Sequence, residues 1–361
     1  MIKPIAIHLP QFHPFAENDE WWGKGFTEWT NVTKAKPQFE GHYQPHLPAD
    51  LGFYDLRLEE SRIAQAELAK AYGIHGFCYY HYWFNGKRLL HRPLDDMLHT
   101  QTPDFPFMLC WANENWSRRW DGNEKDVLMH QNYSEQDDIE HIRFLIEHFF
   151  QDNRYIKVND KPFLLIFRPN LIPSVEDTIA RWRTVAAESG VELYLGFIKS
   201  PFYDPEDFEN QGFDCGVQFH PDLYLAPTQE FPPLIDRIKH RLGIKDSVYY
   251  KNYIGSYKAY VDKQLTLPTP DKSTTYPGIT PGWDNSARKR TGAIIFKDCN
   301  PDDYARWLSD IAKRYKGDDT YLFINAWNEW AEGNHLEPCQ KWGRRFLEET
   351  KKFVEQFGGL L

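Results

Sequence analysis

Two glutamates near the C-terminus have a spacing that is compatible with cleavage of a glycosidic bond. They belong to the run Asn325-Ala-Trp-Asn-Glu-Trp-Ala-Glu-Gly333, at the end of the apolar stretch Tyr321 to Ala326. Glu329 and Glu332 are three residues apart, so a helical turn directs both to one side with Cβ atoms about 5–6 Å apart. Glycoside chemistry needs two carboxyl groups around one bond, one of them kept protonated by its surroundings. The pair is therefore compatible with a retaining arrangement.

The same pair also has a structural interpretation. In it, one glutamate caps the following helix and the other pairs with Arg344 or Arg345. Acidic residues are common in the first turn of a helix, where they oppose the helix dipole. The two interpretations predict different partners for the carboxylates.

Asn113 and Glu114 form a competing centre. An Asn-Glu dipeptide at the end of a strand is a familiar acid/base arrangement in barrel glycosidases. Arg118 and Arg119 follow closely, and a nearby guanidinium favours the ionised form of a carboxyl group. We therefore expect Glu114 to accept hydrogen bonds from sugar hydroxyls, with acid/base work as its alternative role.

Polar and aromatic side chains follow the other apolar runs as well. Tryptophans beside polar residues are predicted to stack on sugar rings, and the polar groups to bind sugar hydroxyls. The predicted substrate-binding residues are Gln11, His13, Tyr80, His81, Trp83, Trp111, Asn113, Glu114, Trp116, Arg168, His220, Trp283, Asp284, Trp327, Asn328 and Glu337. Trp182 and Trp307 lie at helical spacing and are predicted to pack in the core.

Three histidines after apolar runs, His8, His81 and His220, raise the question of a metal site. No His-x-His or His-Glu-x-x-His spacing supports one, so hydrogen bonding to hydroxyl groups is the favoured interpretation. We expect neither a metal nor another cofactor.

Short apolar runs alternate with helical patterns along the chain. The runs are Ile5 to Leu9, Gly76 to Tyr82, Phe107 to Trp111, Phe163 to Phe167, Leu193 to Ile198, Gly216 to Phe219, Thr274 to Ile279 and Tyr321 to Ala326. Runs that are apolar on both faces and separated by helices indicate a parallel sheet covered by helices. Eight of them predict an α/β fold of the (β/α)₈ TIM barrel type. An open doubly wound sheet is the alternative, but no Gly-x-Gly-x-x-Gly follows the first run.

Helix signals separate these runs. Leu56 to Tyr72 ends at Gly73, a common residue type after a helix, and capping residues predict helix starts at Ser134, Ser174 and Asn300. The last helix is expected from about Arg344 to Gln356. The candidate site residues follow the C-terminal ends of the runs, which is where barrel enzymes place their active sites.

Two segments exceed the needs of a minimal barrel. They are residues of about 10–52, rich in Trp, His and Pro, and of about 222–271, with Pro-rich turns and many tyrosines. Long loops in compact domains are often functional. Because no linker composition marks a boundary, we expect residues 1–361 to form a single barrel domain with these two loop insertions at its C-terminal face.

Composition narrows the partners and the compartment. Aromatic residues make up 16% of the 361 residues, and the net charge is −10. This balance favours a neutral glycan over nucleic acid. The five scattered cysteines predict free thiols, and no apolar segment has the length of a signal or of a membrane span. We expect a cytoplasmic protein without an integral membrane segment.

Six motifs spread over nearly the whole chain are recognisable. They are Leu9-Pro-Gln-Phe-His13, Glu20-Trp-Trp-Gly-Lys-Gly-Phe-Thr-Glu-Trp-Thr-Asn31, His42-Tyr-Gln-Pro-His46, Tyr79-Tyr-His-Tyr-Trp83, Cys110-Trp-Ala-Asn-Glu-Asn-Trp116 and Asn325-Ala-Trp-Asn-Glu-Trp-Ala-Glu-Gly333. Together they resemble the WbsX-like family, which is related to glycoside hydrolase family 99, the endo-α-mannosidases and endo-mannanases. The resemblance implies a (β/α)₈ barrel.

The resemblance also implies roles for two residues. In family 99 the first Glu of the Asn-Glu-Trp-x-Glu-Gly pattern removes the proton of the sugar's 2-hydroxyl, which gives a 1,2-anhydro intermediate, and the second is the general acid/base. These residues correspond to Glu329 and Glu332. Ala331 is a departure, because family 99 hydrolases carry His or a similar residue there. WbsX-like proteins are commonly labelled glycosyltransferases of surface-polysaccharide or O-antigen clusters.

Three functions follow from these observations. The first is a retaining glycoside hydrolase or transglycosylase that acts on mannose-like or related sugars of a bacterial surface polysaccharide. The second is a nucleotide-sugar-dependent transferase of lipopolysaccharide, O-antigen or capsule biosynthesis, although no convincing Asp-x-Asp site is present. The third is a non-catalytic glycan-binding protein.

Overall fold

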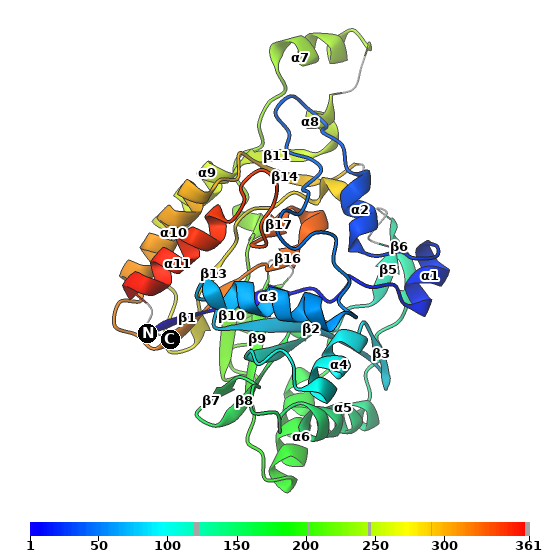
Figure 1. Ribbon diagram of the computed structural model, residues 1–361, viewed down its shortest axis with the longest axis vertical. Helices are drawn as coiled ribbons and strands as arrows, with labels where there is room; N and C mark the ends of the chain where they lie inside the picture. The colour runs from blue at the N-terminus through cyan, green and yellow to red at the C-terminus, as the bar shows by residue number, and fades with distance from the viewer. Residues whose placement is uncertain (119–122, 201–202, 245–246, 290, 358–361) are drawn as a thin grey trace.

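Parallel strands form the centre of the fold in the computed structural model, which describes residues 1–118, 123–200, 203–244, 247–289 and 291–357 (Figure 1). The barrel strands are β1 (Ile2–His8), β2 (Gly76–Phe84), β4 (Phe107–Trp111), β8 (Lys161–Ile166), β9 (Tyr194–Lys199), β10 (Cys215–Gln218), β12 (Thr275–Tyr276), β13 (Gly278–Ile279) and β15 (Thr320–Ile324). Their order is β12-β10-β9-β8-β4-β2-β1-β15-β13. The two ends of this order, β12 and β13, are joined by Pro277 alone, so the sheet closes on itself. The predicted (β/α)₈ barrel is confirmed, with its seventh strand split in two.

The split seventh strand explains why its sequence signal is weak. β12 pairs with β10 through Thr275, and β13 pairs with β15 through Gly278 and Ile279. A Cβ atom on Gly278 would lie 2.0 Å from the backbone oxygen of Gln218, which is closer than any side chain can approach. Glycine is therefore required where β13 passes the end of β10.

Helices cover the outside of the barrel (Figure 1). They are α3 (Glu59–Ala71), α4 (Arg92–Thr100), α5 (Glu135–His148), α6 (Val175–Glu188), α9 (Tyr257–Thr266), α10 (Pro301–Arg314) and α11 (Arg345–Phe357). Side chains of Ser134 and Asn300 accept hydrogen bonds from the third helical residue of α5 and α10, as predicted. Ser174 precedes α6 but accepts no capping bond; its hydroxyl donates to Asp177 instead.

The remaining elements lie in the connections. The segment of residues 10–52 contains α1 (Ala16–Trp22) and α2 (Glu28–Lys34), and the segment between β10 and β12 contains α7 (Leu234–Arg241), α8 (Val248–Lys251) and β11 (Tyr253–Ser256) in addition to α9. β11 pairs with β14 (Ile294–Lys297). Shorter strands elsewhere are β3 (Lys87–Leu89), β5 (Trp116–Arg118), β6 (Asn123–Met129), β7 (Lys157–Val158), β16 (Asn328–Glu329) and β17 (Asn334–His335).

Two expectations about the whole chain can be compared with the structure directly. The five cysteines are free thiols, as predicted. Within the described residues, no helix combines the length and the apolar character needed to cross a bilayer.

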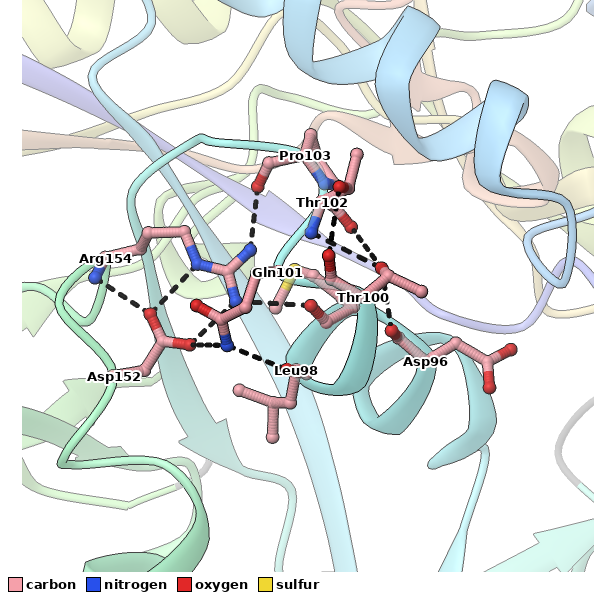
Figure 2. A network of polar contacts seen from close by, with 9 residues as sticks. Asp96, Leu98, Thr100, Gln101, Thr102, Pro103, Asp152 and Arg154 are labelled. Atoms are coloured by element: carbon pink, nitrogen blue, oxygen red, sulfur yellow. Dashed lines mark hydrogen bonds and ion pairs between the residues drawn. The ribbon is translucent and has the colours of Figure 1, made fainter.

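Arg154 joins the connections that precede β4 and β8, at the N-terminal ends of these strands. Figure 2 shows the network around it. It follows α5 and donates from Nη1 to the backbone oxygen of Pro103 (2.9 Å) and from Nη2 to that of Met97 (3.2 Å). It also forms a two-point ion pair with Asp152, at 2.9 and 2.7 Å. Both side chains are nearly fully buried. This network fixes the end of α4 and the approach to β4, which delivers Asn113 and Glu114 to the other end.

Replacing Arg154 with Met should lower the free energy of unfolding by about 2 kcal/mol, because a buried carboxylate and two backbone oxygens lose their donor. Urea denaturation followed by circular dichroism measures this. Arg345→Met is a matched control, since the Arg345–Asp302 pair is exposed and should be worth about 0.5 kcal/mol or less. Equal losses in both variants would contradict a structural role for the network.

Candidate active site

One short turn at the end of β15 carries both candidate catalytic glutamates. Glu329 ends β16 and precedes the 3₁₀ turn η6 (Trp330–Glu332). A 3₁₀ turn has three residues per turn, so residues three apart project to the same side. Gly333 ends the turn with φ of +58°, and a Cβ atom there would lie 2.9 Å from Cβ of Asp284. The local sequence Glu-Trp-Ala-Glu-Gly thus places the two carboxyl groups on the same side of the turn.

Arg288 binds both carboxyls at once. Its Nη1 donates to Glu332, and its Nη2 donates to Glu329 (2.8 Å). It comes from the segment after η5 (Asn285–Ala287) and lies far from both glutamates in the chain. Neither Arg344 nor Arg345 is the partner, because these pair with Asp50 and Asp302. The predicted pairing of a glutamate with Arg344 or Arg345 is therefore wrong.

Glu28 is a third carboxyl on the same guanidinium. It is the first residue of α2, its side chain is fully buried, and its Oε1 accepts from Arg288 Nη2 (2.7 Å). The same oxygen accepts from the backbone N–H of Ala331 (3.0 Å), inside the η6 turn. Glu28 therefore ties the segment of residues 10–52 to both Arg288 and the catalytic turn.

Burial changes the proton affinity of this cluster. Burial raises the pKa of Glu329 from 4.5 to about 8, while the positive charge of Arg288 acts in the opposite direction. The pKa of Glu332 is also raised by burial, against the same guanidinium. Although burial works against the charged form of Arg288, the three carboxylates raise its pKa further above its ordinary range. Arg288 therefore stays charged while at least one carboxyl holds a proton near neutral pH.

Two tyrosines of β2 and the pair Glu114–Arg168 share this neighbourhood. Burial raises the pKa of Tyr80 and of Tyr82, and the negative charge of Glu329 adds to both effects. The charges of Arg288 and Glu114 also act on Tyr82. Glu114 binds Arg168 Nη1, and its side chain is 20% exposed, as is that of Glu332. These residues form one partly open, charged mouth.

Arg168, at the end of β8, supplies a cation beside Glu114. The predicted neighbours were Arg118 and Arg119. Arg119 and the side chain of Arg118 lie outside what the structure describes, so their part in holding Glu114 ionised stays a prediction. Because neighbouring parallel strands end side by side, the end of β8 reaches Glu114 directly.

Two buried asparagines hold strand ends together. Asn113 donates to the backbone oxygen of Arg168 (2.8 Å) and accepts from its N–H (2.7 Å), which joins the ends of β4 and β8. Asn328 forms the same two-way pairing with the backbone of Leu9, at 2.7 and 3.0 Å. Both were predicted to bind substrate, but in the structure their amide groups position the neighbouring Glu114 and Glu329.

Three aromatic residues predicted at the mouth lie instead between the sheet and the helices. His81 Nε2 is 3.1 Å from His141 Nε2 of α5, and Trp83 Nε1 donates to Asp137 of the same helix (2.8 Å). Trp111 packs on Trp182 of α6. Strand side chains alternate between the two faces, and these three point outward. Their placement indicates packing, and the predictions for Trp182 and Trp307 as core residues hold, since both are buried.

His220 and Glu337 likewise have their polar groups paired with other side chains. His220 Nδ1 is 2.8 Å from the hydroxyl of Tyr260, and burial lowers its pKa to about 3. Glu337 accepts from Tyr54, Gln65 and Trp330, at 2.8, 2.7 and 2.6 Å.

Trp327 and Trp116 are part of the buried aromatic packing. Trp327 packs against Phe77 at 5.0 Å, and Trp116 packs edge-on against Tyr82 at 5.2 Å in a small cluster beside β3. Packing explains both positions.

Gln11 and His13 follow β1. Gln11 is fully buried, and neither its amide nitrogen nor its amide oxygen has a partner within the described residues. Its backbone oxygen accepts from the N–H of Glu28 (3.0 Å), which places it beside the cluster. His13 contacts the backbone oxygen of Pro10, and burial lowers its pKa to about 4. A substrate-binding role for Gln11 stays a prediction that its unsatisfied amide favours.

Trp283 and Asp284 line a separate cavity of about 210 Å³. Asp284 accepts from Gln44 (2.8 Å), lies 2.7 Å from His42 Nε2, and binds the backbone oxygen of Glu332 through its own N–H (2.6 Å). Although burial acts against it, the contact with His42 lowers the pKa of Asp284. The carboxylate cluster does not line this cavity, so we place the active site at the carboxylates rather than at the hollow.

Glu28 and Arg288 were not predicted. Glu28 lies within the quoted motif Glu20 to Asn31, so a signal existed, but no strand end precedes it. Arg288 follows Asp284 in a turn without any distinguishing pattern. Of the three histidines considered for a metal, each has its own neighbour, and the described residues contain no cluster of three or more His, Cys, Asp or Glu arranged to hold an ion.

The sequence match to a known family spans residues 4–350. The chain belongs to the family described as Glycosyltransferase WbsX. The protein WxcX of Xanthomonas campestris pv. campestris (strain B100) is 40% identical over 353 residues, which are 96% of this chain and 49% of WxcX. The chain thus spans about half the length of the curated relatives it matches.

Solved structures with a similar fold include proteins named as glycoside hydrolases. The GH99 endo-alpha-mannosidase from Bacteroides thetaiotaomicron aligns with a TM-score of 0.58 at 13% identity, covering 98% of this chain and 97% of that one. A glycoside hydrolase-like protein aligns with a TM-score of 0.60 at 15% identity, covering 99% and 94%. These likenesses support the barrel fold, and the resemblance to WbsX-like proteins is confirmed.

The raised pKa of Glu329 predicts a pH-dependent stability. Between 4.5 and about 8 the folded state holds a proton that the unfolded chain releases. The free energy of unfolding therefore falls as the pH rises through this window, by at most about 1.4 kcal/mol per pH unit. Glu329→Gln lacks this proton, so its stability relative to the unmodified protein should increase with pH. Denaturant unfolding across the window measures this, and a difference independent of pH would contradict it.

Proposed function

We propose that this WbsX family member is a carbohydrate-active enzyme that cleaves or transfers a glycosyl unit through Glu329 and Glu332. The observation that carries the proposal is the η6 turn, which presents both carboxyls to one guanidinium at the C-terminal end of the barrel. The family description and the folds of the similar structures support it, because both belong to enzymes that act on carbohydrates.

The proposed reaction uses the sugar's own 2-hydroxyl. Glu329 takes the proton of this hydroxyl, and the oxygen attacks C1 to form a 1,2-anhydro sugar. The bond from C1 to the glycosidic oxygen breaks, and Glu332 protonates that oxygen. Glu332 then takes a proton from water or from an acceptor hydroxyl, whose oxygen attacks C1. The bond from C1 to O2 breaks, and Glu329 returns its proton to O2. The configuration at C1 is retained after two inversions.

The electrostatics of the cluster suit these roles. Once ionised, a carboxylate whose pKa is about 8 is a stronger base than an ordinary glutamate, and the ionised fraction of Glu329 grows as the pH rises toward this value. The raised pKa of Glu332 favours the protonated form that a general acid needs. The positive charge of Arg288 offsets one negative charge of the cluster. One of the two glutamates can therefore be ionised while the other is protonated.

Mannose-like or related sugars of a bacterial surface polysaccharide are the proposed substrates. The name of the similar endo-alpha-mannosidase and the bacterial source of WxcX support this class. Hydroxyl-binding groups are offered by Tyr80 and Tyr82, on which the charge of Glu329 acts, by Gln11, whose backbone contacts Glu28, and by the Glu114–Arg168 pair.

Replacing Glu329 or Glu332 with Gln should lower turnover by about 100-fold or more, because each removes one proton-transfer group. Mass spectrometry of products from mannose-containing oligosaccharides measures this. Glu355→Gln, an exposed glutamate of α11, is the matched control and should leave turnover unchanged. Full activity in both site variants would contradict the assignment of Glu329 and Glu332 as catalytic residues.

A substrate without the 2-hydroxyl separates this mechanism from ordinary double displacement. The 2-deoxy form of the substrate should bind but not react, because it has no oxygen at C2 to form the anhydro ring. Product formation from the 2-deoxy sugar at a comparable rate would show that a protein carboxylate attacks C1 instead.

Transfer from a nucleotide sugar is the second candidate, and the family description favours it. Calorimetric titration with a panel of nucleoside diphosphate sugars distinguishes the two. We expect no nucleotide-dependent binding if the anhydro mechanism operates, whereas tight binding that requires the nucleotide would favour the transferase. Binding of oligosaccharides without any product would instead identify a glycan-binding protein.

A further inference from the structure

Helix α7 presents an apolar face that nothing in the described structure covers. Leu234, Ile235, Ile238 and Leu242 are between 45% and 70% exposed, and every residue of α7 is at least partly exposed. At about 100° per residue these four side chains share one face about 100° wide. Phe231, three residues before the helix, and Tyr224, in the turn η4 (Leu223–Leu225) further upstream, are more than 80% exposed. Apolar side chains gathered in this way mark an interaction surface.

Basic residues border the apolar face of α7. On the helical wheel Lys239 and Arg241 lie at its two edges, and Arg237 lies beyond Arg241 on the same side, with Asp236 as the only acidic residue of the helix. The chain as a whole carries a net charge of −10, so this concentration of positive charge is local. Long basic side chains beside an apolar stripe are typical of helices that lie in the plane of a lipid surface.

We propose that α7 is an interfacial helix that seats this protein on an anionic lipid surface. Its apolar face enters the boundary of the acyl chains, and Lys239 and Arg241 reach lipid phosphates at its edges. A helix of eight residues is only about 12 Å long, so its face is far smaller than the surface that a stable protein interface buries. A self-association through α7 would also bring the basic edges of two copies together. A lipid surface is compatible with the small area of this apolar face, and anionic lipids complement its positive charge.

The position of α7 gives this attachment a consequence for the active site. α7 projects from the connection between β10 and β12, which leaves the C-terminal end of the barrel, and forms one tip of the molecule (Figure 1). Glu230 anchors its base through its N–H to Ile254 of β11 (2.7 Å) and through its carboxylate to Lys297 of β14 (2.6 Å). The partner strand β14 follows Arg288 in the chain. Attachment through α7 therefore brings the catalytic side of the barrel toward the lipid surface.

Sedimentation with vesicles tests the proposal on the full chain. Vesicles of phosphatidylcholine with phosphatidylglycerol should bind the protein, and vesicles of phosphatidylcholine alone should bind it much more weakly. The double variant Ile235→Asp/Ile238→Asp should lower binding by about tenfold or more, since both side chains leave the lipid. Lys239→Glu/Arg241→Glu should remove the preference for the anionic vesicles and the sensitivity to salt.

Leu58→Asp is the matched control, because Leu58 is 55% exposed and precedes α3, where aspartate is a favourable capping residue. Its vesicle binding should equal that of the unmodified protein, and circular dichroism should show the same fold for all variants. The proposal is overturned if the unmodified protein stays in the supernatant or if Ile235→Asp/Ile238→Asp binds as well as the control. It is also overturned if sedimentation velocity shows an oligomer that this double variant dissolves, which would identify a second copy as the partner of α7.

Discussion

The guanidinium of Arg288 is the group on which the arrangement of the candidate catalytic carboxyls depends. It binds Glu28, Glu329 and Glu332 in a place where water is largely excluded. Three buried carboxylates without a counter-ion would repel one another and would lose their hydration. The free-energy cost would be far larger than the stabilisation that the local backbone turn provides. With Arg288 present, the cluster has one positive charge for three carboxyl groups. Burial is the main cause of the raised pKa values of Glu329 and Glu332, and the repulsion from the neighbouring carboxylates adds to it.

The same cation joins segments that the chain separates widely. Glu28 and Arg288 are 260 residues apart, and Arg288 and Glu332 are 44 apart. Glu28 also binds the backbone of Ala331, so the segment before the first barrel helix holds the last catalytic turn in place. The long segment of residues 10–52 thus has a direct part in the site.

Alternation along the strands decides which aromatic residues can meet a substrate. In β2, the charge of Glu329 raises the pKa of Tyr80 and Tyr82, whereas His81 and Trp83 pack on α5. Adjacent residues in one motif therefore serve different layers of the protein. The buried asparagines 113 and 328 add a third role, because they join the ends of neighbouring strands so that Glu114 and Glu329 have fixed positions.

The sequence by itself determined the barrel, most strand positions and the location of the two glutamates in one turn. These features are local: an apolar run, its capping signals and a spacing of three residues are all read within a short window. It also determined that polar residues collect at the C-terminal ends of the strands.

Only the tertiary structure decided which side chains face the mouth and what neutralises the carboxylates. The face of a strand residue depends on register, and a shift of one residue reverses it, so Trp83 and Trp111 could not be separated from Tyr80 by sequence alone. The choice of Arg288 over Arg344 or Arg345, and the arrival of Glu28, depend on contacts between distant segments. Such contacts leave no mark in local composition, because any exposed loop can carry a glutamate or an arginine.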